Sequence, residues 1–385
     1  MLLLTKKYEQ TSMKEILFSF RGRVLRFLYV HFFKKIVFRI DPEKVHDSMV
    51  SFGMYLGGYG LLRSITSFLF QYKHPMLAQT VCGINFENPV GLSAGFDKNA
   101  RLTNILPAVG FGFAELGSIT GEKCEGNPKP RLWRLKKSKS ILVHYGLMND
   151  GAEAIGKRLR GKMFKIPVGI NIAKTNTKST IEKEAGAADY LKAYREMDDI
   201  GSYVTINISC PNAYGGCPFT KADTLTYLLS RLSEIPKRKP IFVKVSPDLS
   251  MQEIDDIIKL SRSFDIDGFI CSNLTKKRGN PMIFDAGFPE YGGMSGKVVD
   301  DLSDALIEHI YRETRGEFVI IGVGGIFSAE DAYRKIRKGA SLVELITGMI
   351  YEGPQLIGEI NRGLVRLLKR DGFSNVAEAI GVDVK

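Results

Sequence analysis

Residues 241–274 read IFVKVSPDLSMQEIDDIIKLSRSFDIDGFICSNL, and this stretch decides the fold class. It begins with a short β-rich run (Ile241–Pro247), continues with a helical pattern (Gln252–Ser263) and ends with a second β-rich run (Gly268–Leu274). A strand, a helix and a strand in this order form two parallel strands joined by a crossover helix. The stretch therefore predicts an α/β fold built on a parallel sheet.

The same alternation continues in both directions along the chain. Eight β-rich runs occur in total, and helical patterns follow most of them: Asn88–Gly95, Phe113–Thr120, Val168–Lys174, Ser202–Cys210, Ile241–Pro247, Gly268–Leu274, Phe318–Gly325 and Ser341–Gly348. Eight such units over roughly 270 residues predict a (β/α)8 TIM barrel. An open, doubly wound sheet is the alternative, but no GxGxxG follows the first run, where that fold carries it.

The composition is that of an ordinary globular protein. The chain has 385 residues, of which 44% are hydrophobic and 25% are charged. These values exclude a disordered chain, a collagen-like repeat and a protein with many membrane spans. The five cysteines form no CxxC pair and the five histidines are scattered, so neither a disulfide framework nor a metal site is predicted.

The positive charge is concentrated near the amino terminus. The net charge is +12, and residues 1–44, with ten Lys or Arg and four Asp or Glu, contribute +6 of it. Residues 13–40 mix large apolar side chains with Arg and Lys, and no uncharged stretch is long enough to span a membrane. The mixture is typical of a basic helix that lies in a membrane interface. The alternative is a helix packed on the protein body with its charges in water.

Two more helices are expected before the barrel. Asp41 is a suitable cap, so one helix is predicted from there to about Met54. Glycine-containing turns follow at residues 57–60, and then a second apolar stretch, Leu61–Phe70.

The expected domains are a basic helical extension with an N-terminal helix at the membrane (1–75), a barrel (76–370) and a C-terminal tail (371–385).

Polar residues and glycines gather at the carboxyl ends of nearly all eight runs. In a barrel these ends share one face, which is where active sites lie. Runs seven and eight end in Gly324-Gly325 and Thr347-Gly348, and the loop Gly292–Gly296 follows run six. Glycines there let backbone N–H groups approach an anion closely, which predicts a phosphate site on this face. A plain turn is the commoner role of any single glycine pair.

Three kinds of polar side chain stand at these strand ends. Lys98 and Lys244 end runs one and five. A buried lysine at a strand end needs an anionic partner, such as a negatively charged flavin. The alternative roles are a lysine that forms a Schiff base and a lysine that lies on the surface. Cys210 ends run four and is a candidate general base or nucleophile, the alternative being an inert buried thiol. Amide side chains suit a planar amide or imide ligand such as a flavin or a pyrimidine; they are Asn171, Asn207, Asn212 and Asn273.

Seven motifs lie in order along the predicted barrel: AGFDKNA (94–100), KPRLWRL (129–135), GINIAK (169–174), NISCPN (207–212), VKVSPDLS (243–250), GGMSG (292–296) and IIGVGGIFSAEDA (320–332). Together they resemble the dihydroorotate dehydrogenase family, whose members use FMN, over about residues 40–365. The segment IDPEKVH (40–46) resembles the class 2 branch, which is membrane-associated and reduces quinones.

The resemblance implies a role for each matching residue. It implies that FMN is held by Ala94, Gly95, Lys98, Ser118, Asn171, Asn207, Lys244, Ser272, Ser295, Gly296, Gly324, Gly325, Thr347 and Gly348. It implies that dihydroorotate or orotate is bound by Lys98, Asn207, Asn212 and Asn273. Cys210 takes the place of the base that removes a proton from C5 of dihydroorotate while hydride leaves C6.

The resemblance also implies partners and a location. A membrane quinone would accept the electrons near the N-terminal helices, and no nucleic-acid partner is expected. The protein would then lie at a membrane surface, either on the cytoplasmic face of a bacterial membrane or on an organelle inner membrane.

Four positions depart from the family pattern. Cys210 stands where class 2 enzymes usually carry Ser; its thiolate is the better base near neutral pH, because the reference pKa of a cysteine is about 8.5. Val143 replaces a substrate-binding Asn, and Leu274 replaces a Thr or Ser after run six. Ile346 replaces the Tyr that class 2 enzymes place between flavin and quinone.

These departures keep other functions open. One is an FMN enzyme of the same family that acts on a different substrate, because Val143 and Leu274 make the pocket less polar. Two more distant alternatives are a barrel that binds phosphate without redox chemistry and an inactive barrel that binds lipid or nucleic acid through its basic terminus.

Overall fold

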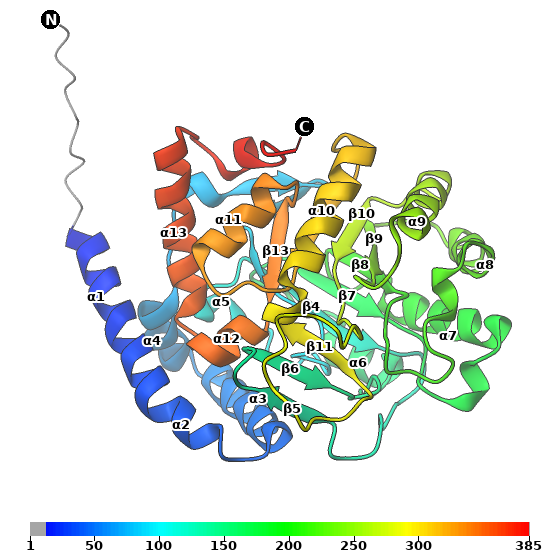
Figure 1. Cartoon of the computed structure of the whole chain (residues 1–385), viewed down its shortest axis with the longest axis horizontal. Coiled ribbons are helices and arrows are strands. Elements are labelled where there is room, and N and C mark those ends of the chain that lie inside the picture. The colour runs from blue at the N-terminus through cyan, green and yellow to red at the C-terminus, as the bar shows by residue number, and fades with distance from the viewer. Residues whose placement is uncertain (1–12, 385) are drawn as a thin grey trace, which may run out of the picture.

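The computed structural model describes residues 13–384 and shows a closed barrel of eight parallel strands (Figure 1). In the order of their pairing around the barrel, the strands are β3 (Val90–Leu92), β4 (Phe113–Ile119), β7 (Val168–Ile172), β8 (Tyr203–Asn207), β9 (Ile241–Val245), β10 (Gly268–Cys271), β12 (Val319–Val323) and β13 (Leu342–Leu345). Each lies within one of the eight predicted runs. The (β/α)8 prediction is therefore confirmed, and the open doubly wound sheet is wrong.

Helices cover the outside of the barrel; they include α5 (Leu106–Val109), α6 (Ala152–Leu159), α7 (Lys183–Met197), α8 (Ala222–Ser233), α9 (Met251–Ser263), α10 (Asp300–Thr314), α11 (Ala329–Arg337) and α13 (Leu356–Asp371). Helix α9 shows how the sequence specifies them. Ser250 and Glu253 form a capping box at its start. Its buried face carries isoleucines at positions i, i+3 and i+4, the spacing of one side of a helix: Ile254, Ile257 and Ile258.

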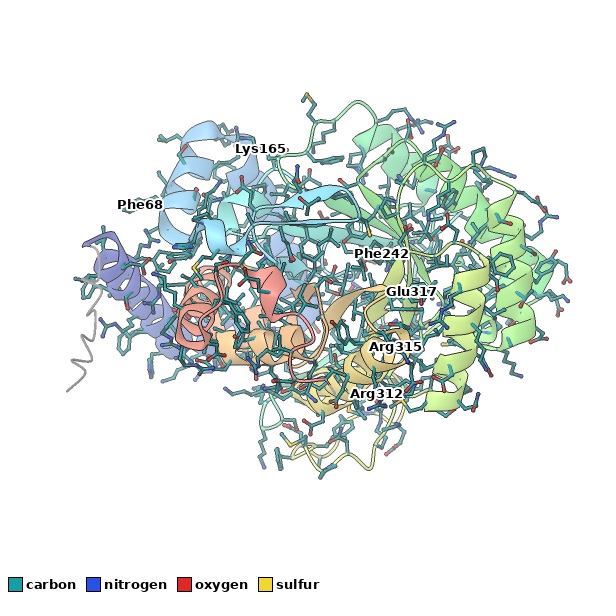
Figure 2. All side chains as sticks on the ribbon, turned by 90° about the horizontal axis from the view of Figure 1, so that it is seen from above. Phe68, Lys165, Phe242, Arg312, Arg315 and Glu317 are labelled. Atoms are coloured by element: carbon teal, nitrogen blue, oxygen red, sulfur yellow. The ribbon has the colours of Figure 1, made fainter. Side chains whose placement is uncertain are left out.

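The amino-terminal end of the barrel is closed by a hairpin that the strand pattern did not predict. Strands β1 (Gln79–Val81) and β2 (Ile84–Phe86) pair antiparallel. Phe86 packs in a buried cluster with inward-facing residues of the barrel strands, among them Phe113 and Phe242. Phe242 is labelled in Figure 2. The hairpin therefore seals the end of the barrel opposite the predicted site.

A second small sheet lies at the carboxyl end. Strands β5 (Leu132–Leu135), β6 (Ser140–Val143) and β11 (Gly293–Gly296) form an antiparallel sheet in the order β11-β6-β5. Part of the predicted glycine loop 292–296 is therefore a strand. The short helix α12 (Thr347–Glu352) follows β13 at the same end of the barrel. These elements form the rim of the barrel mouth.

The N-terminal extension is helical from the first described residue. It contains α1 (Met13–Leu28), a π-helical turn (Tyr29–Phe33), α2 (Lys34–Val37), α3 (Pro42–Gly58) and α4 (Gly60–Phe70). Asp41 caps α3 as predicted, accepting hydrogen bonds from the N–H groups of Glu43 and Lys44. The helix runs four residues beyond the predicted end at Met54. Gly57 lies so close to Asn104 and Ile105 that a side chain at this position would crowd both residues. Residues 1–12 of the extension lie outside the described part of the chain.

Polar contacts attach α1 and α2 to the rim. Arg26 Nη2 lies 2.6 Å from Glu352 Oε2, the Tyr29 hydroxyl donates to the Ile350 carbonyl at 2.7 Å, and Lys34 Nζ donates to the Tyr351 carbonyl at 2.9 Å. The interpretation of this segment as a helix packed on the protein body is thus correct for one of its faces.

The other face of the extension leaves large apolar side chains in water. Phe68 of α4, at the edge of the molecule in Figure 2, is more than half exposed, as are Phe20, Phe27, Phe32, Phe52 and Leu61. Within residues 13–384, no helix is both long and apolar enough to cross a membrane.

The segment 371–385, expected as a tail, packs on the barrel in its described part. Val376 and Ala379 are fully buried in the main hydrophobic core.

Candidate active site

One continuous cavity of about 600 Å³ joins the carboxyl ends of the barrel strands to the N-terminal helices. Cys210 and Lys244 line its inner part, and Phe33 and Phe52 line its outer part. The fold explains this arrangement, because the carboxyl ends of parallel strands meet at one face of a barrel. The N-terminal helices lie beside that face and contribute an apolar wall.

The structure brings together all but one of the residues that the sequence assigned to the site. Those lining the cavity are Ala94, Gly95, Lys98, Ser118, Asn207, Cys210, Asn212, Lys244, Ser272, Asn273, Ser295, Gly296, Gly324, Gly325, Thr347 and Gly348. Asn171 is fully buried within β7 and is not part of the lining. The roles given to these residues stay predictions.

A buried charge network supports the inner end of the cavity. Lys244 Nζ lies 3.2 Å from Glu115 Oε1, so the lysine has the anionic partner that its burial requires. Asn171 Nδ2 and Thr205 Oγ1 each donate to a Glu115 oxygen at 2.8 Å. Glu344 is also fully buried, and burial together with the nearby Glu115 carboxylate raises its pKa well above the ordinary value of a glutamate. The sequence did offer a signal for Glu115, the one charged residue in its β-rich run.

The Cys210 thiol is less acidic than the sequence suggested. Burial raises its pKa to about 12, although the Asn212 N–H group and the charges of Lys174 and Lys276 act in the opposite direction. Cys217 Sγ donates to the Cys210 carbonyl at 3.2 Å. The thiol is therefore almost entirely protonated at neutral pH, and the small thiolate fraction is a strong base.

The predicted asparagines hold one another in place. Asn207 Nδ2 donates to Ser118 Oγ at 2.9 Å, and Asn273 Nδ2 donates to Asn207 Oδ1 at 3.3 Å. Asn212 Nδ2 donates to the Val143 carbonyl at 2.9 Å. The Oδ1 atom of Asn212 is buried without a hydrogen-bond partner. That oxygen is therefore available to accept a hydrogen bond from a ligand N–H group.

Lys98 contacts a histidine from the N-terminal extension. Its Nζ atom lies 3.3 Å from His46 Nε2 and 3.9 Å from the centre of the Tyr145 ring. Burial lowers the pKa of Lys98 to about 8, and burial together with Lys98 lowers the pKa of His46 to about 2. His46 is thus neutral and accepts a hydrogen bond from Lys98. This histidine was not among the residues predicted from the sequence, although it lies in the IDPEKVH motif.

The glycines of the rim adopt backbone conformations that other residues rarely adopt. Gly324 has a φ of 120° and Gly325 a φ of 73°, in the region that favours glycine. Next to them, the hydroxyls of Ser295 and Thr347 lie 2.8 Å apart. This part of the cavity therefore offers hydroxyls and closely approaching backbone, which suits a phosphate.

The residues that depart from the family pattern also line the cavity. Val143, Leu274 and Ile346 are all part of its wall. The Leu274 N–H donates to Asn273 Oδ1 at 2.8 Å, so the leucine orients the neighbouring amide through its backbone. Val143 and Leu274 therefore stand beside the amides of Asn212 and Asn273.

Comparison with known proteins gives a consistent result. Residues 76–368 match the sequence profile of the family described as dihydroorotate dehydrogenase. A "Dihydroorotate dehydrogenase (quinone)" from Natronomonas pharaonis is 39% identical over 351 residues, which cover 91% of this chain and 98% of that protein. A protein of the same name from Nostoc punctiforme is 40% identical over 364 residues, covering 91% and 96%.

Solved structures agree with the sequence relatives. Ligand-free DHODH from Eimeria tenella is 31% identical with a TM-score of 0.79, and the match covers 90% of this chain and all of that one. The same enzyme in complex with ferulenol has a TM-score of 0.77 at 31% identity, covering 89% and 96%. The chain therefore belongs to the dihydroorotate dehydrogenase family.

Proposed function

We propose that this protein oxidises dihydroorotate to orotate with the help of bound FMN and passes the electrons to a membrane quinone. The observation that carries the proposal is the continuous cavity, which has polar groups and glycines at the barrel mouth and apolar side chains at the N-terminal helices. A charged, planar substrate fits the first region, and an apolar electron acceptor fits the second.

The residues present fit FMN. Gly324, Gly325 and the hydroxyls of Ser295 and Thr347 suit its phosphate, because they combine closely approaching backbone with hydrogen-bonding side chains. Asn207 lines the same cavity, and its amide suits the imide edge of a flavin ring. Lys244 would face the ring with a positive charge. Bound FMN would accept the hydride of the substrate and release electrons one or two at a time.

The substrate site follows from the groups that remain. Lys98 is still largely protonated at neutral pH, because its pKa is about 8, and its ammonium attracts the carboxylate of dihydroorotate. The free Oδ1 of Asn212 suits an N–H group of the pyrimidine ring. Cys210 Sγ takes the proton from C5 while hydride leaves C6, and the C5–C6 double bond of orotate forms.

The outer part of the cavity suits a quinone at a membrane surface. Its wall includes Phe33, Phe38 and Phe52, and exposed aromatic side chains continue from it over the surface of the extension. Arg and Lys residues stand among these aromatics, a mixture that suits anionic lipid headgroups. We infer that the protein is a peripheral membrane protein that receives quinone through its N-terminal helices.

Anaerobic reduction of the bound flavin tests the proposal. Addition of dihydroorotate to the purified yellow protein is expected to bleach the flavin absorbance near roughly 450 nm, and a soluble ubiquinone analogue is expected to restore it. A protein that stays oxidised at millimolar dihydroorotate would exclude this substrate.

A second candidate, a related substrate with fewer hydrogen-bonding groups, rests on the apolar side chains of Val143 and Leu274 in the wall, but the relatives named dihydroorotate dehydrogenase (quinone) do not favour it. If dihydroorotate is the substrate, Val143→Asn should supply a missing polar contact and tighten the binding of the pyrimidine ring by about two- to tenfold, since a hydrogen bond contributes about 0.5–1.5 kcal/mol. Titration of the oxidised flavin spectrum with orotate measures this, and Val143→Leu is the apolar control. Weaker orotate binding in Val143→Asn would favour the second candidate.

A further inference from the structure

Lys174 is a buried lysine close to the proposed base, and neither FMN nor dihydroorotate binding has been assigned to it. It follows β7 by two residues, and Cys210 follows the neighbouring strand β8 by three. Ile172 and Ile206, near the ends of these strands, are paired in register, so the two segments that follow them run side by side. Lys174 is 3% exposed.

The charge of Lys174 has no paired carboxylate among residues 13–384. Its Nζ atom donates to the carbonyl oxygen of Tyr214 at 2.8 Å. Burial lowers the pKa of Lys174, and the acidic groups that oppose this shift are, in order of strength, Cys210, Asp189 and Cys217. The Asp189 carboxylate is already held by the backbone N–H and hydroxyl of Thr175, at 2.6 and 2.8 Å. A buried cation without its own anion is costly, so the charge of Lys174 favours ionisation of Cys210, the acidic group that acts on it most strongly.

The surroundings of Cys210 lead to the same conclusion. The groups that affect its thiol are the Asn212 N–H, Cys217, Lys174 and Lys276. Lys276 is exposed, so water screens its charge. Lys174 is therefore the one buried cation among these groups, and its charge acts through a medium of low polarity.

Lys174 also holds the loop that carries the thiol. Residues 210–217 contain Gly215 and Gly216, both with positive φ (74° and 68°), and Tyr214 precedes them. The Tyr214 N–H donates to Asn176 Oδ1 at 2.6 Å, and its carbonyl accepts from Lys174. The peptide groups on both sides of Tyr214 are thus anchored to the segment that follows β7.

We propose that Lys174 is a positioning residue for the base: its buried ammonium favours the thiolate of Cys210, and its hydrogen bond to Tyr214 fixes the loop 210–217. The relevance to catalysis rests on the role given to Cys210 under the proposed function. The effect on the thiol itself does not require dihydroorotate to be the substrate.

Alkylation of Cys210 by iodoacetamide tests the proposal without any substrate. The full-length, flavin-containing protein is used, with Cys217→Ser in every variant so that Cys210 is the only thiol in its loop. Because only the thiolate reacts, and loss of a close opposite charge shifts a pKa by about one unit or more, Lys174→Met is expected to slow alkylation about tenfold. The modified peptide is quantified by mass spectrometry over a range of pH below the thiol pKa.

Two matched variants separate the charge from the anchoring of the loop. Lys174→Arg keeps the charge and should retain most of the rate. Asn176→Ala removes the other anchor of Tyr214 without removing a charge, and it should leave the rate unchanged or raise it by exposing the thiol. An unchanged or faster rate in Lys174→Met would overturn the proposal. An equal slowing in Asn176→Ala would do so as well, because it would assign the effect to the loop alone.

The pH profile of flavin reduction gives a second readout. Lys174→Met should displace the profile by about one unit to higher pH. Asn176→Ala should change the size of the rate constant but not its dependence on pH. If dihydroorotate does not reduce the flavin at all, the proposed function fails while the alkylation result still decides the role of Lys174.

Discussion

Replacement of Cys210 with alanine is expected to slow flavin reduction by dihydroorotate about a hundred- to ten-thousand-fold, the usual contribution of a positioned general base. The thiol lies on a loop at the barrel mouth and lines the same cavity as Lys98 and Asn207. Alanine keeps the fold of this loop but leaves no group to take the C5 proton. Anaerobic stopped-flow absorbance of the flavin measures the rate, and the flavin content of the purified variant verifies that the site is intact.

The pH dependence of the same step identifies the base. Burial raises the pKa of the Cys210 thiol to about 12. The thiolate fraction therefore grows with pH below that value, so the rate of reduction should rise about tenfold per pH unit up to about pH 8. Above that pH the rise should flatten, because Lys98, whose pKa is about 8, loses the charge that attracts the substrate carboxylate. The residual rate of Cys210→Ala should not show this rise.

Cys217→Ala is the matched control, since it removes the other thiol of the loop. It removes the hydrogen bond to the Cys210 carbonyl but leaves the base in place. Its rate should stay far closer to that of the unmodified protein than to that of Cys210→Ala. A Cys210→Ala variant with nearly full activity would show that another group takes the proton.

The barrel could be predicted from the sequence because each of its strands is a buried, β-rich run. Strands buried on both faces, such as β10, read as continuous apolar stretches. The hairpin β1–β2 and the sheet β5-β6-β11 are different, because none of their strands is buried along its whole length. The equally short barrel strands β3, β10 and β13 are fully buried. A short run that is only partly buried has no clear pattern of apolar residues and cannot be distinguished from a loop.

The site was predictable where topology alone determines it. Residues at the carboxyl ends of barrel strands must share one face, and this rule is sufficient to bring Cys210, Lys244 and Thr347 together. Contacts between distant segments carried no such signal. His46 reaches Lys98 from a helix 52 residues earlier in the chain, and only the packing of α3 on the barrel places it there.

Electrostatic properties were the least predictable part of the site. The reference pKa of cysteine led to the expectation of a readily ionised thiol at position 210. The structure buries that thiol, and the cost of burying a charge outweighs the effect of Lys174 and Lys276. A pKa depends on the balance of burial and neighbouring charges, which a sequence does not contain.

Deletion of residues 1–40 is expected to abolish most quinone-dependent turnover while leaving flavin reduction by dihydroorotate intact. The deletion removes Tyr29, Phe33, Val37 and Phe38 from the wall of the cavity. Burial of one large apolar side chain contributes about 1.5–3 kcal/mol, so the loss of several should lower kcat/KM for a quinone more than about a hundredfold. The same deletion should weaken binding to anionic lipid vesicles, because it removes exposed aromatics and basic residues of α1 and α2.

Two neighbouring phenylalanines distinguish the acceptor site from a general effect on stability. Phe33 lines the cavity, whereas Phe32 does not and is 58% exposed. Phe33→Ala should therefore raise KM for a soluble quinone about tenfold or more. Phe32→Ala should leave this KM nearly unchanged. Steady-state rates of both variants are measured with quinone and with a polar dye as the electron acceptor. Equal losses with quinone and dye would mean that the helices support the barrel rather than the acceptor. In the deletion variant, only α3 and α4 would contribute an apolar wall on this side of the cavity. Full quinone activity in this variant would therefore mean that the acceptor reaches the flavin by another route.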